Sequence, residues 1–127
     1  MSTDLTIELD DTAGELARLG RAFNEGGVNI EGLCGVGSGG PTIEVHVLVD
    51  DAEAAFAALA TVGIGVESES EVLVVEVEDR LGVIGEIGSA LGDADVNLHL
   101  LYMATATRLV IGADDLAAAR DVLLNYR

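Results

Sequence analysis

The sequence contains no lysine. Its six basic residues are all arginine and are set against 23 acidic residues, which gives a net charge of −17. So strong a negative field repels phosphate backbones and anionic lipid headgroups, and we therefore expect neither a nucleic acid nor a membrane surface as a partner. Aromatic residues make up 3% of the chain. This scarcity also argues against the aromatic-rich sheets on which RNA-binding domains stack bases.

Cysteine occurs once, at Cys34, so the chain can form no internal disulfide and offers no pair of cysteine metal ligands. His46 and His99 have no second histidine or cysteine at ligand spacing, so we expect no metal site. No apolar run approaches the roughly 20 residues of a membrane-spanning helix. The first residues lack the basic and apolar regions of a signal peptide. We expect a soluble, cytoplasmic protein without a cofactor.

The chain carries an internal repeat. The segment from Ile7 to Asp11 aligns without a gap on the segment from Val75 to Asp79, at a constant offset of 68 residues (79 − 11 = 68). Identical residues occur at this offset in the pairs Asp11/Asp79, Gly14/Gly82, Gly20/Gly88, Ala22/Ala90, Val28/Val96 and Asn29/Asn97. So regular a match indicates two copies of one supersecondary unit. We expect one domain over residues 1–70 and a second over residues 71–127.

The hydrophobic pattern predicts the elements of the first copy. Apolar and polar residues alternate up to Asp10, as in a half-buried strand, and apolar residues then recur at spacings of three and four up to Gly26. The elements expected next are a strand from Val28, a glycine-rich loop over 35–40, a strand from Pro41, a helix from Asp51 and a short strand over 66–69. The loop matches G-x-G-x-x-G but leads into a strand rather than a helix, so we interpret it as a hairpin loop and not as a nucleotide site.

The second copy is predicted to stop one strand short. Its expected elements are strands over 73–78, 96–103 and 108–113 and helices over 81–93 and 114–125, and Tyr126–Arg127 is too short for another strand. We expect four apolar residues on the sheet face turned away from the helices, namely Val72, Val74, Leu101 and Met103. This is too much apolar surface for a solvated face, so a homodimer is predicted. By pseudo-symmetry, the second strands of the two copies are expected to pair with each other.

Two motifs at the right spacing give the chain a family resemblance. Asp-x-x-Gly follows the first strand in Asp11–Gly14 and Asp79–Gly82, and small-Val-Asn-aliphatic opens the second strand in Gly27–Ile30 and Asp95–Leu98. This combination resembles the ACT domain family, and the resemblance covers nearly the whole chain. It implies an α+β fold of two ferredoxin-like βαββαβ units with antiparallel sheets, the second without its last strand.

The resemblance also implies a function. Members of the family are mostly non-catalytic regulatory modules of amino-acid metabolism, which bind an amino acid or a similar small ligand where two modules meet. They transmit the presence or absence of the bound ligand to an enzyme, so a metabolic enzyme is the implied partner. Carried onto the matching positions, the candidate ligand-binding residues are Asp11, Thr12, Ala13, Gly14, Asn29, Ile30, Asp79, Arg80, Leu81, Gly82, Asn97 and Leu98. No catalytic residue is expected.

The turn residues suit the two charged ends of an amino acid. Free backbone amides at the start of a helix can bind a carboxylate, and Gly14 or Gly82 lets a ligand approach the backbone closely. The carboxylates of Asp11 and Asp79 could accept hydrogen bonds from an ammonium group. The alternative interpretation is that these aspartates, or Thr12, cap the helices that follow.

Three further side chains have two interpretations each. The amides of Asn29 and Asn97 offer donors and an acceptor, so they could bind both ends of a zwitterion. Each could instead be a turn residue that bonds its own backbone. Arg80 could hold a ligand carboxylate with two hydrogen bonds, or it could pair with a carboxylate on the protein surface.

Two other functional classes compete with a ligand-binding regulator. The first is a structural or interaction module of the same fold with lapsed ligand sites; the family often has proline before the turn glycine, where this chain has Ala13 and Leu81. The second is an enzyme such as a small phosphatase, which requires a cationic loop for phosphate. The turn of the first copy has no basic residue and the chain has no lysine, so the sequence disfavours this class.

Overall fold

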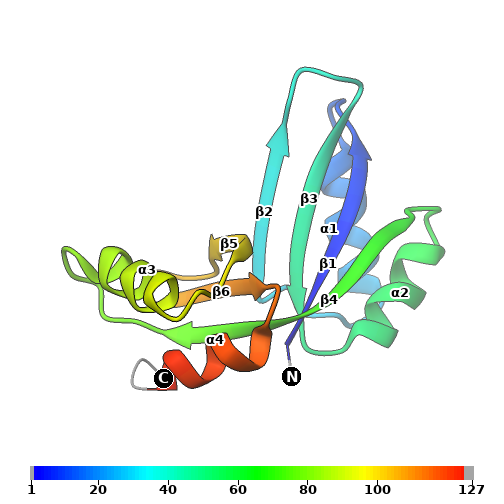
Figure 1. Cartoon of the computed structure of the whole chain (residues 1–127). Helices are drawn as coiled ribbons and strands as arrows, with labels where there is room; N and C mark the ends of the chain where they lie inside the picture. The colour runs from blue at the N-terminus through cyan, green and yellow to red at the C-terminus, as the bar shows by residue number, and fades with distance from the viewer. Residues whose placement is uncertain (1, 125–127) are drawn as a thin grey trace. The chain divides into compact units, whose positions relative to one another are not determined.

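The computed structural model describes residues 2–124, which fold into two compact units, Ser2–Ser70 and the segment from Glu71 onward (Figure 1). The elements of the first unit are β1 (Ser2–Asp10), α1 (Glu15–Glu25), β2 (Gly32–Gly37), β3 (Thr42–Val49), α2 (Ala52–Ala60) and the first part of β4 (Val66–Glu76). Its strands have the order β2-β3-β1-β4, and β3 pairs antiparallel with β1 and β2.

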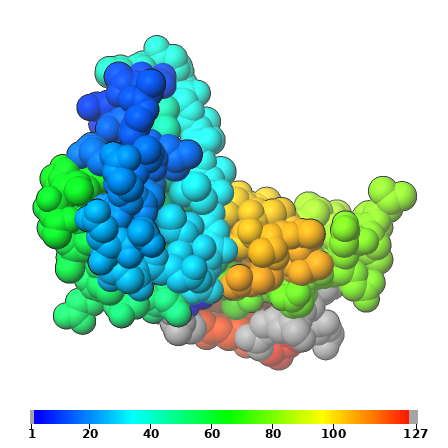
Figure 2. Space-filling view, turned by 180° about the vertical axis from the view of Figure 1, so that it is seen from behind, coloured from blue at the N-terminus to red at the C-terminus, as the bar shows by residue number. Residues whose placement is uncertain are grey.

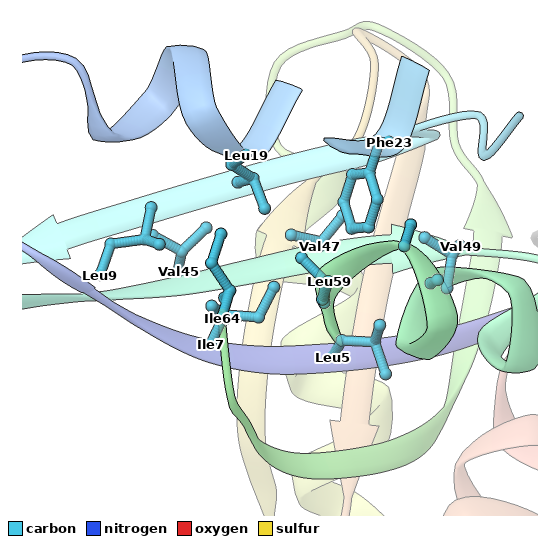
Figure 3. Close-up of a cluster of buried hydrophobic side chains, with 12 residues drawn as sticks. Leu5, Ile7, Leu9, Leu19, Phe23, Val45, Val47, Val49, Leu59 and Ile64 are labelled. Carbon is cyan, nitrogen blue, oxygen red and sulfur yellow. The ribbon is translucent and has the colours of Figure 1, made fainter. Parts of the chain in front are cut away.

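The core of the first unit lies between the sheet and its two helices. Alternate side chains of β1 and β3 point toward α1 and α2 (Figure 3), because successive residues of a strand face opposite sides. The core residues with no more than 5% of their surface exposed are Leu5, Ile7, Leu9, Leu19, Phe23, Val45, Val47, Val49, Ala55, Ala58, Leu59 and Ile64. One aromatic ring among eleven aliphatic side chains agrees with the composition of the chain.

The second unit repeats this plan with one strand fewer. Its elements are the last part of β4, α3 (Val83–Asp93), β5 (Leu98–Met103), β6 (Arg108–Ala113) and α4 (Leu116–Val122), with the strand order β4-β6-β5. No strand follows α4 within residues 2–124, and Tyr126–Arg127 lie outside the described residues. The predicted fold class, two ferredoxin-like units with antiparallel sheets and an incomplete second unit, is confirmed. None of the described helices is long and apolar enough to cross a membrane.

Several predicted strand boundaries are wrong. The two strands expected over 66–69 and 73–78 form one continuous strand, β4, because no glycine or proline interrupts the chain between them. β2 begins at Gly32 and β5 at Leu98, later than the predicted starts at residues 28 and 96. Asn29 and Asn97 therefore lie in the segments that lead into these strands.

The predicted direction of two side chains of β5 is also wrong. Leu101 pairs with Ile111 and Met103 with Leu109, and both partners belong to the core beneath the helices. Directly paired residues lie on the same face of a sheet, so Leu101 and Met103 face the helices and not the opposite side. The register shifts between Leu98 and Leu100, and an extra residue at such an irregularity reverses every later side chain.

The second strand of each unit pairs with a strand of its own unit. β2 is hydrogen-bonded to β3, and β5 is hydrogen-bonded to β6. Residues of β2 (cyan) and β5 (yellow to orange) lie at the surface in the space-filling view (Figure 2). Each of these edge strands therefore has one side on which its backbone groups can still pair.

The contact between α1 and α2 predicts opposite effects for two glycine substitutions. A Cβ atom on Gly26 would lie 2.7 Å from the Cβ of Ala58, so we expect Gly26→Ala to lower the free energy of unfolding by about 1–3 kcal/mol. A Cβ atom on Gly20, inside α1, would have no atom within 4 Å, so Gly20→Ala should raise it by about 0.5–1 kcal/mol. Urea unfolding followed by circular dichroism measures both. Stabilisation by Gly26→Ala would contradict the close contact.

Candidate functional site

The Asp-x-x-Gly segment is a tight turn between a strand and a helix in both units. It ends at Gly14 before α1 and at Gly82 before α3, and both glycines have left-handed backbone conformations, with φ of 93° and 87°. This conformation strains a residue that has a Cβ atom. The repeated glycines are thus explained by the direction in which the chain must enter the helix.

The helices that follow these turns have no side-chain cap, whereas the other two helices have one. Asp51 accepts a hydrogen bond from the Ala54 amide at 3.0 Å at the start of α2, and Asp115 accepts one from the Ala118 amide at 3.0 Å at the start of α4. Neither α1 nor α3 has such a bond. The interpretation of Asp11, Thr12 and Asp79 as helix caps is therefore wrong, and these side chains do not use the first amides of α1 and α3.

An apolar hollow lies beside the turn of the second unit. It has a volume of about 420 Å³ and lies at the start of α3 and the end of β5. We call it the second-unit hollow; its lining consists of Val77, Glu78, Asp79, Arg80, Val83, Ile84, Leu101, Tyr102, Met103, Ala106 and Leu109. Aliphatic side chains dominate this lining, and its charged groups belong to the turn. A concave apolar surface with a few polar groups at one end is typical of a small-molecule site.

The first unit has an equivalent but smaller hollow, of about 230 Å³. This first-unit hollow is lined by Leu9, Leu16, Leu33, Gly35, Gly37, Ile43 and Val45. Four of its residues match lining residues of the second-unit hollow at the offset of 68, in the pairs Leu9/Val77, Leu16/Ile84, Leu33/Leu101 and Gly35/Met103. The residues that line the hollows therefore follow the sequence repeat, and the two hollows occupy equivalent positions in the two units.

Arg80 at the rim of the second-unit hollow is held by two carboxylates. Its Nε donates to Glu78 Oε2 at 3.0 Å, its Nη2 donates to Glu86 Oε1 at 2.9 Å, and its Nη1 donates to Glu86 Oε2. The hydrogen bonds from Arg80 lower the pKa of Glu86, and those from Glu86 raise the pKa of Arg80. Of the two interpretations of Arg80, the structure supports pairing with surface carboxylates.

The candidate residues divide into two groups. In the second unit, Asp79 and Arg80 line the hollow and Gly82 begins α3 beside it, whereas the side chain of Leu81 is 99% exposed. The corresponding turn of the first unit runs over 11–14, and the Asp11 amide donates to the Pro41 carbonyl at 2.9 Å. The turns are therefore next to the hollows, although Asp11, Thr12, Ala13 and Gly14 do not line the first one.

The asparagine segments lie elsewhere within each unit. Asn29 and Asn97 precede the first residues of β2 and β5, whereas the hollows adjoin the later residues of these strands. The Asn97 side chain donates to Asp114 Oδ2 at 3.1 Å. Ile30 and Leu98 pack against the cores of their units. Neither asparagine is among the residues that line the hollow of its unit.

Most of the hollow could not be predicted from the sequence. The pattern placed Leu101 on the wrong face of the sheet and grouped Leu16 with the apolar residues of its helix, whereas Leu16 and its repeat partner Ile84 are exposed residues of the first helical turns. The sequence did contain one indication of the hollows. The pairs Leu16/Ile84 and Leu33/Leu101 repeat at the offset of 68, yet these residues are 41–64% exposed and do not fill the core.

A charged cluster occupies the face of the first unit opposite its helices. His46 Nδ1 lies 2.9 Å from the buried Asp4 carboxylate, and Nε2 lies 2.9 Å from Glu44 Oε2. Burial lowers the pKa of His46, but the hydrogen bonds to Asp4 and Glu44 outweigh it and raise the pKa above 6.5. Nearby, the hydrogen bond with Glu8 raises the pKa of Glu67. Within residues 2–124, no group of three His, Cys, Asp or Glu side chains could hold a metal ion.

This cluster predicts a pH dependence of stability. Because the folded state raises the pKa of His46, the stabilisation by its protonated ring is complete below pH 6.5 and is lost as the pH rises through the higher pKa of the folded state. We expect urea titrations to show a decrease in the free energy of unfolding over that window. His46→Gln should remove this pH dependence of the free energy of unfolding. His99→Gln is the matched control and should keep it. An unchanged slope in His46→Gln would contradict the assignment.

The sequence matches no family model and no curated protein, but the structure resembles solved structures. A protein from Bacteroides thetaiotaomicron matches with a TM-score of 0.84 at 19% identity, over 97% of this chain and 86% of that chain. The ligand-free regulatory subunit of aspartate kinase from Thermus thermophilus matches with a TM-score of 0.75 at 19% identity, over 98% of this chain and 91% of that chain.

The regulatory subunit of aspartate kinase from Thermus flavus matches with a TM-score of 0.73 at 18% identity, over 98% of this chain and 92% of that chain. These likenesses establish the fold, and the predicted resemblance to tandem ACT-type units is confirmed at that level.

Proposed function

We propose that this protein is a non-catalytic regulatory protein of amino-acid metabolism that binds an amino acid. The observation that carries the proposal is the repeated combination of an apolar hollow, an Asp-x-x-Gly turn and a helix without a side-chain cap. The fold shared with regulatory subunits of aspartate kinase supports it. In this proposal, a metabolic enzyme is the partner that responds to the bound ligand.

Each part of the site has one task in this proposal. The hollow receives the side chain of the amino acid, and the first amides of the helix receive its carboxylate at the positive end of the helix dipole. Asp79, which lines the second-unit hollow, accepts hydrogen bonds from the ammonium group. Gly82 and Gly14 have no side chain between the ligand and the backbone. The arrangement has donors for an anion and acceptors for a cation a short distance apart, as a zwitterion requires.

A second copy of the chain would complete the site. The hollows are open beside the edge strands β2 and β5, whereas a small-molecule site normally encloses about 70–90% of its ligand. Antiparallel pairing of β5 with β5 of a second copy would bring the start of one strand to the end of the other. Asn97 would then approach the second-unit hollow of the partner. This arrangement would bring an asparagine to a turn, whereas the lining of the second-unit hollow contains the turn residues alone.

The first test is ligand binding. An amino acid present at 100 times its Kd should raise the free energy of unfolding by about 2.7 kcal/mol, so a thermal-shift screen of the standard amino acids should identify it. Asn97→Ala should then weaken binding by about 1–3 kcal/mol in calorimetry, because a desolvated polar group of the ligand loses its partner. Asn24→Ala, on the exposed side of α1, is the control and should bind normally.

The competing function is a structural module of the same fold with lapsed sites. It is favoured by the carboxylates that already hold Arg80. If no standard amino acid shifts the unfolding transition, this function replaces the one proposed.

The second test is the oligomeric state. We expect a homodimer, because the edges of β2 and β5 are open and Leu33, Leu101 and Met103 beside them are 41–49% exposed. Two chains of −17 each repel one another, and salt screens that repulsion over a Debye length of about 8 Å at physiological ionic strength. Light scattering at micromolar concentration should therefore show a dimer that becomes tighter as salt is added. A monomer at both low and high salt would refute the dimer.

A further inference from the structure

The second-unit hollow has an apolar interior and a charged rim. Val77, Val83 and Leu109 form its deep wall, with 2–7% of their surface exposed. Ile84, Leu101 and Met103 form its open side, with 42–49% exposed. The charged lining residues come from the turn and stand at one end. A charged side chain placed among the aliphatic residues would lose its hydration without gaining a partner, so the interior favours an uncharged apolar group.

The rim has more negative than positive charge. Glu78, Asp79 and Arg80 line the hollow at this end, and the Arg80 guanidinium already donates hydrogen bonds to the carboxylates of Glu78 and Glu86. A ligand whose only charge is a carboxylate meets net repulsion here. A ligand that also carries an ammonium group gains an attraction at the same place. The rim therefore favours an amino acid over the 2-oxo acid of the same shape.

The first-unit hollow differs from the second-unit hollow in its lining and its volume. Its lining is entirely apolar and includes Gly35 where the second unit has Met103. At the offset of 68, Glu15 replaces Val83, and its carboxylate is held by Arg18 through a hydrogen bond of 3.0 Å. Its volume is about 230 Å³, against about 420 Å³ in the second unit. No polar group in its lining could orient the charged ends of an amino acid.

We infer that the two units are unequal: the second-unit hollow is the ligand site, and its ligand is an amino acid with an uncharged aliphatic or thioether side chain. This inference rests on the proposed function and specifies its ligand. Leu101 and Met103 determine the specificity, since they form the open side of the hollow against which the ligand side chain packs. The carboxylates of the rim select the ammonium group.

The first experiment compares ligands on the full chain by isothermal titration calorimetry. The probes are L-leucine, L-methionine, L-lysine, L-aspartate and 4-methyl-2-oxopentanoate, the 2-oxo acid of leucine. Leucine or methionine should bind at least about tenfold more tightly than lysine or aspartate. The 2-oxo acid should also bind at least about tenfold more weakly than leucine, because it has no ammonium group to meet the carboxylates.

The second experiment uses the repeat as its own control. Leu101→Ala should weaken leucine binding by about tenfold or more, and the matched variant Leu33→Ala should leave it within about twofold. Asp79→Asn and its match Asp11→Asn provide a second pair at exposed positions, where folding is not at risk. Asp79→Asn should weaken leucine binding and reduce the advantage of leucine over its 2-oxo acid, while Asp11→Asn should do neither.

The outcomes separate this inference from the proposed function. If no amino acid binds, both fail. If an amino acid with a charged side chain binds best, or if Leu33→Ala weakens binding as much as Leu101→Ala does, the inference fails while the regulatory, amino-acid-binding function stands. Tight binding of leucine or methionine that depends on Leu101 and Asp79, and not on Leu33 and Asp11, supports both.

Discussion

Each unit depends on the burial of one face of its antiparallel sheet beneath two helices. Alternate aliphatic residues of β1 and β3 in the first unit, and of β4 and β6 in the second, supply that face. Burial of apolar area is the main favourable contribution to folding, so it determines where α1 and α3 must lie. The chain can enter these helices from the preceding strand through a left-handed glycine, Gly14 or Gly82. The absence of a side-chain cap at the start of α1 and α3 accompanies that turn.

The same packing produces the hollows. Each hollow is lined by residues of an edge strand, β2 or β5, together with residues of the first turn of α1 or α3. The side chains at those places, such as Leu33 and Leu101, face the helices but remain half-exposed, since the described part of the chain covers them incompletely. An apolar surface that a core of this size cannot cover is available for a ligand, for a second copy, or for both together.

Electrostatics distinguishes two units that share one backbone plan. In the first unit, Arg18 pairs with Glu15 and donates to the Val62 carbonyl at 2.7 Å, so its charge is used within the body of the unit. In the second unit, the basic residue lies in the turn itself, where Arg80 pairs with Glu78 and Glu86. With so few cations in the chain, the position of one arginine changes the charge at the rim of a hollow. A duplicated fold has thus acquired two different surfaces.

The repeat, the order of the elements and the fold class could all be predicted from the amino-acid sequence. These follow from local rules: the alternation of apolar residues in strands, their three- and four-residue spacing in helices, and the conformations that glycine alone adopts easily. The sequence also pointed to the turns over 11–14 and 79–82 as parts of a site.

The tertiary structure alone decided which face Leu101 and Met103 occupy, because a register irregularity in β5 reverses them and leaves no mark in the hydrophobic pattern. It alone decided that Asp51 and Asp115 cap helices while Asp11 and Asp79 do not. It also decided that Arg80 is held by two glutamates and that the hollows lie beside the turns. Pairing across strands and the approach of side chains from distant segments depend on three-dimensional distance, which the spacing of residues along one chain does not encode.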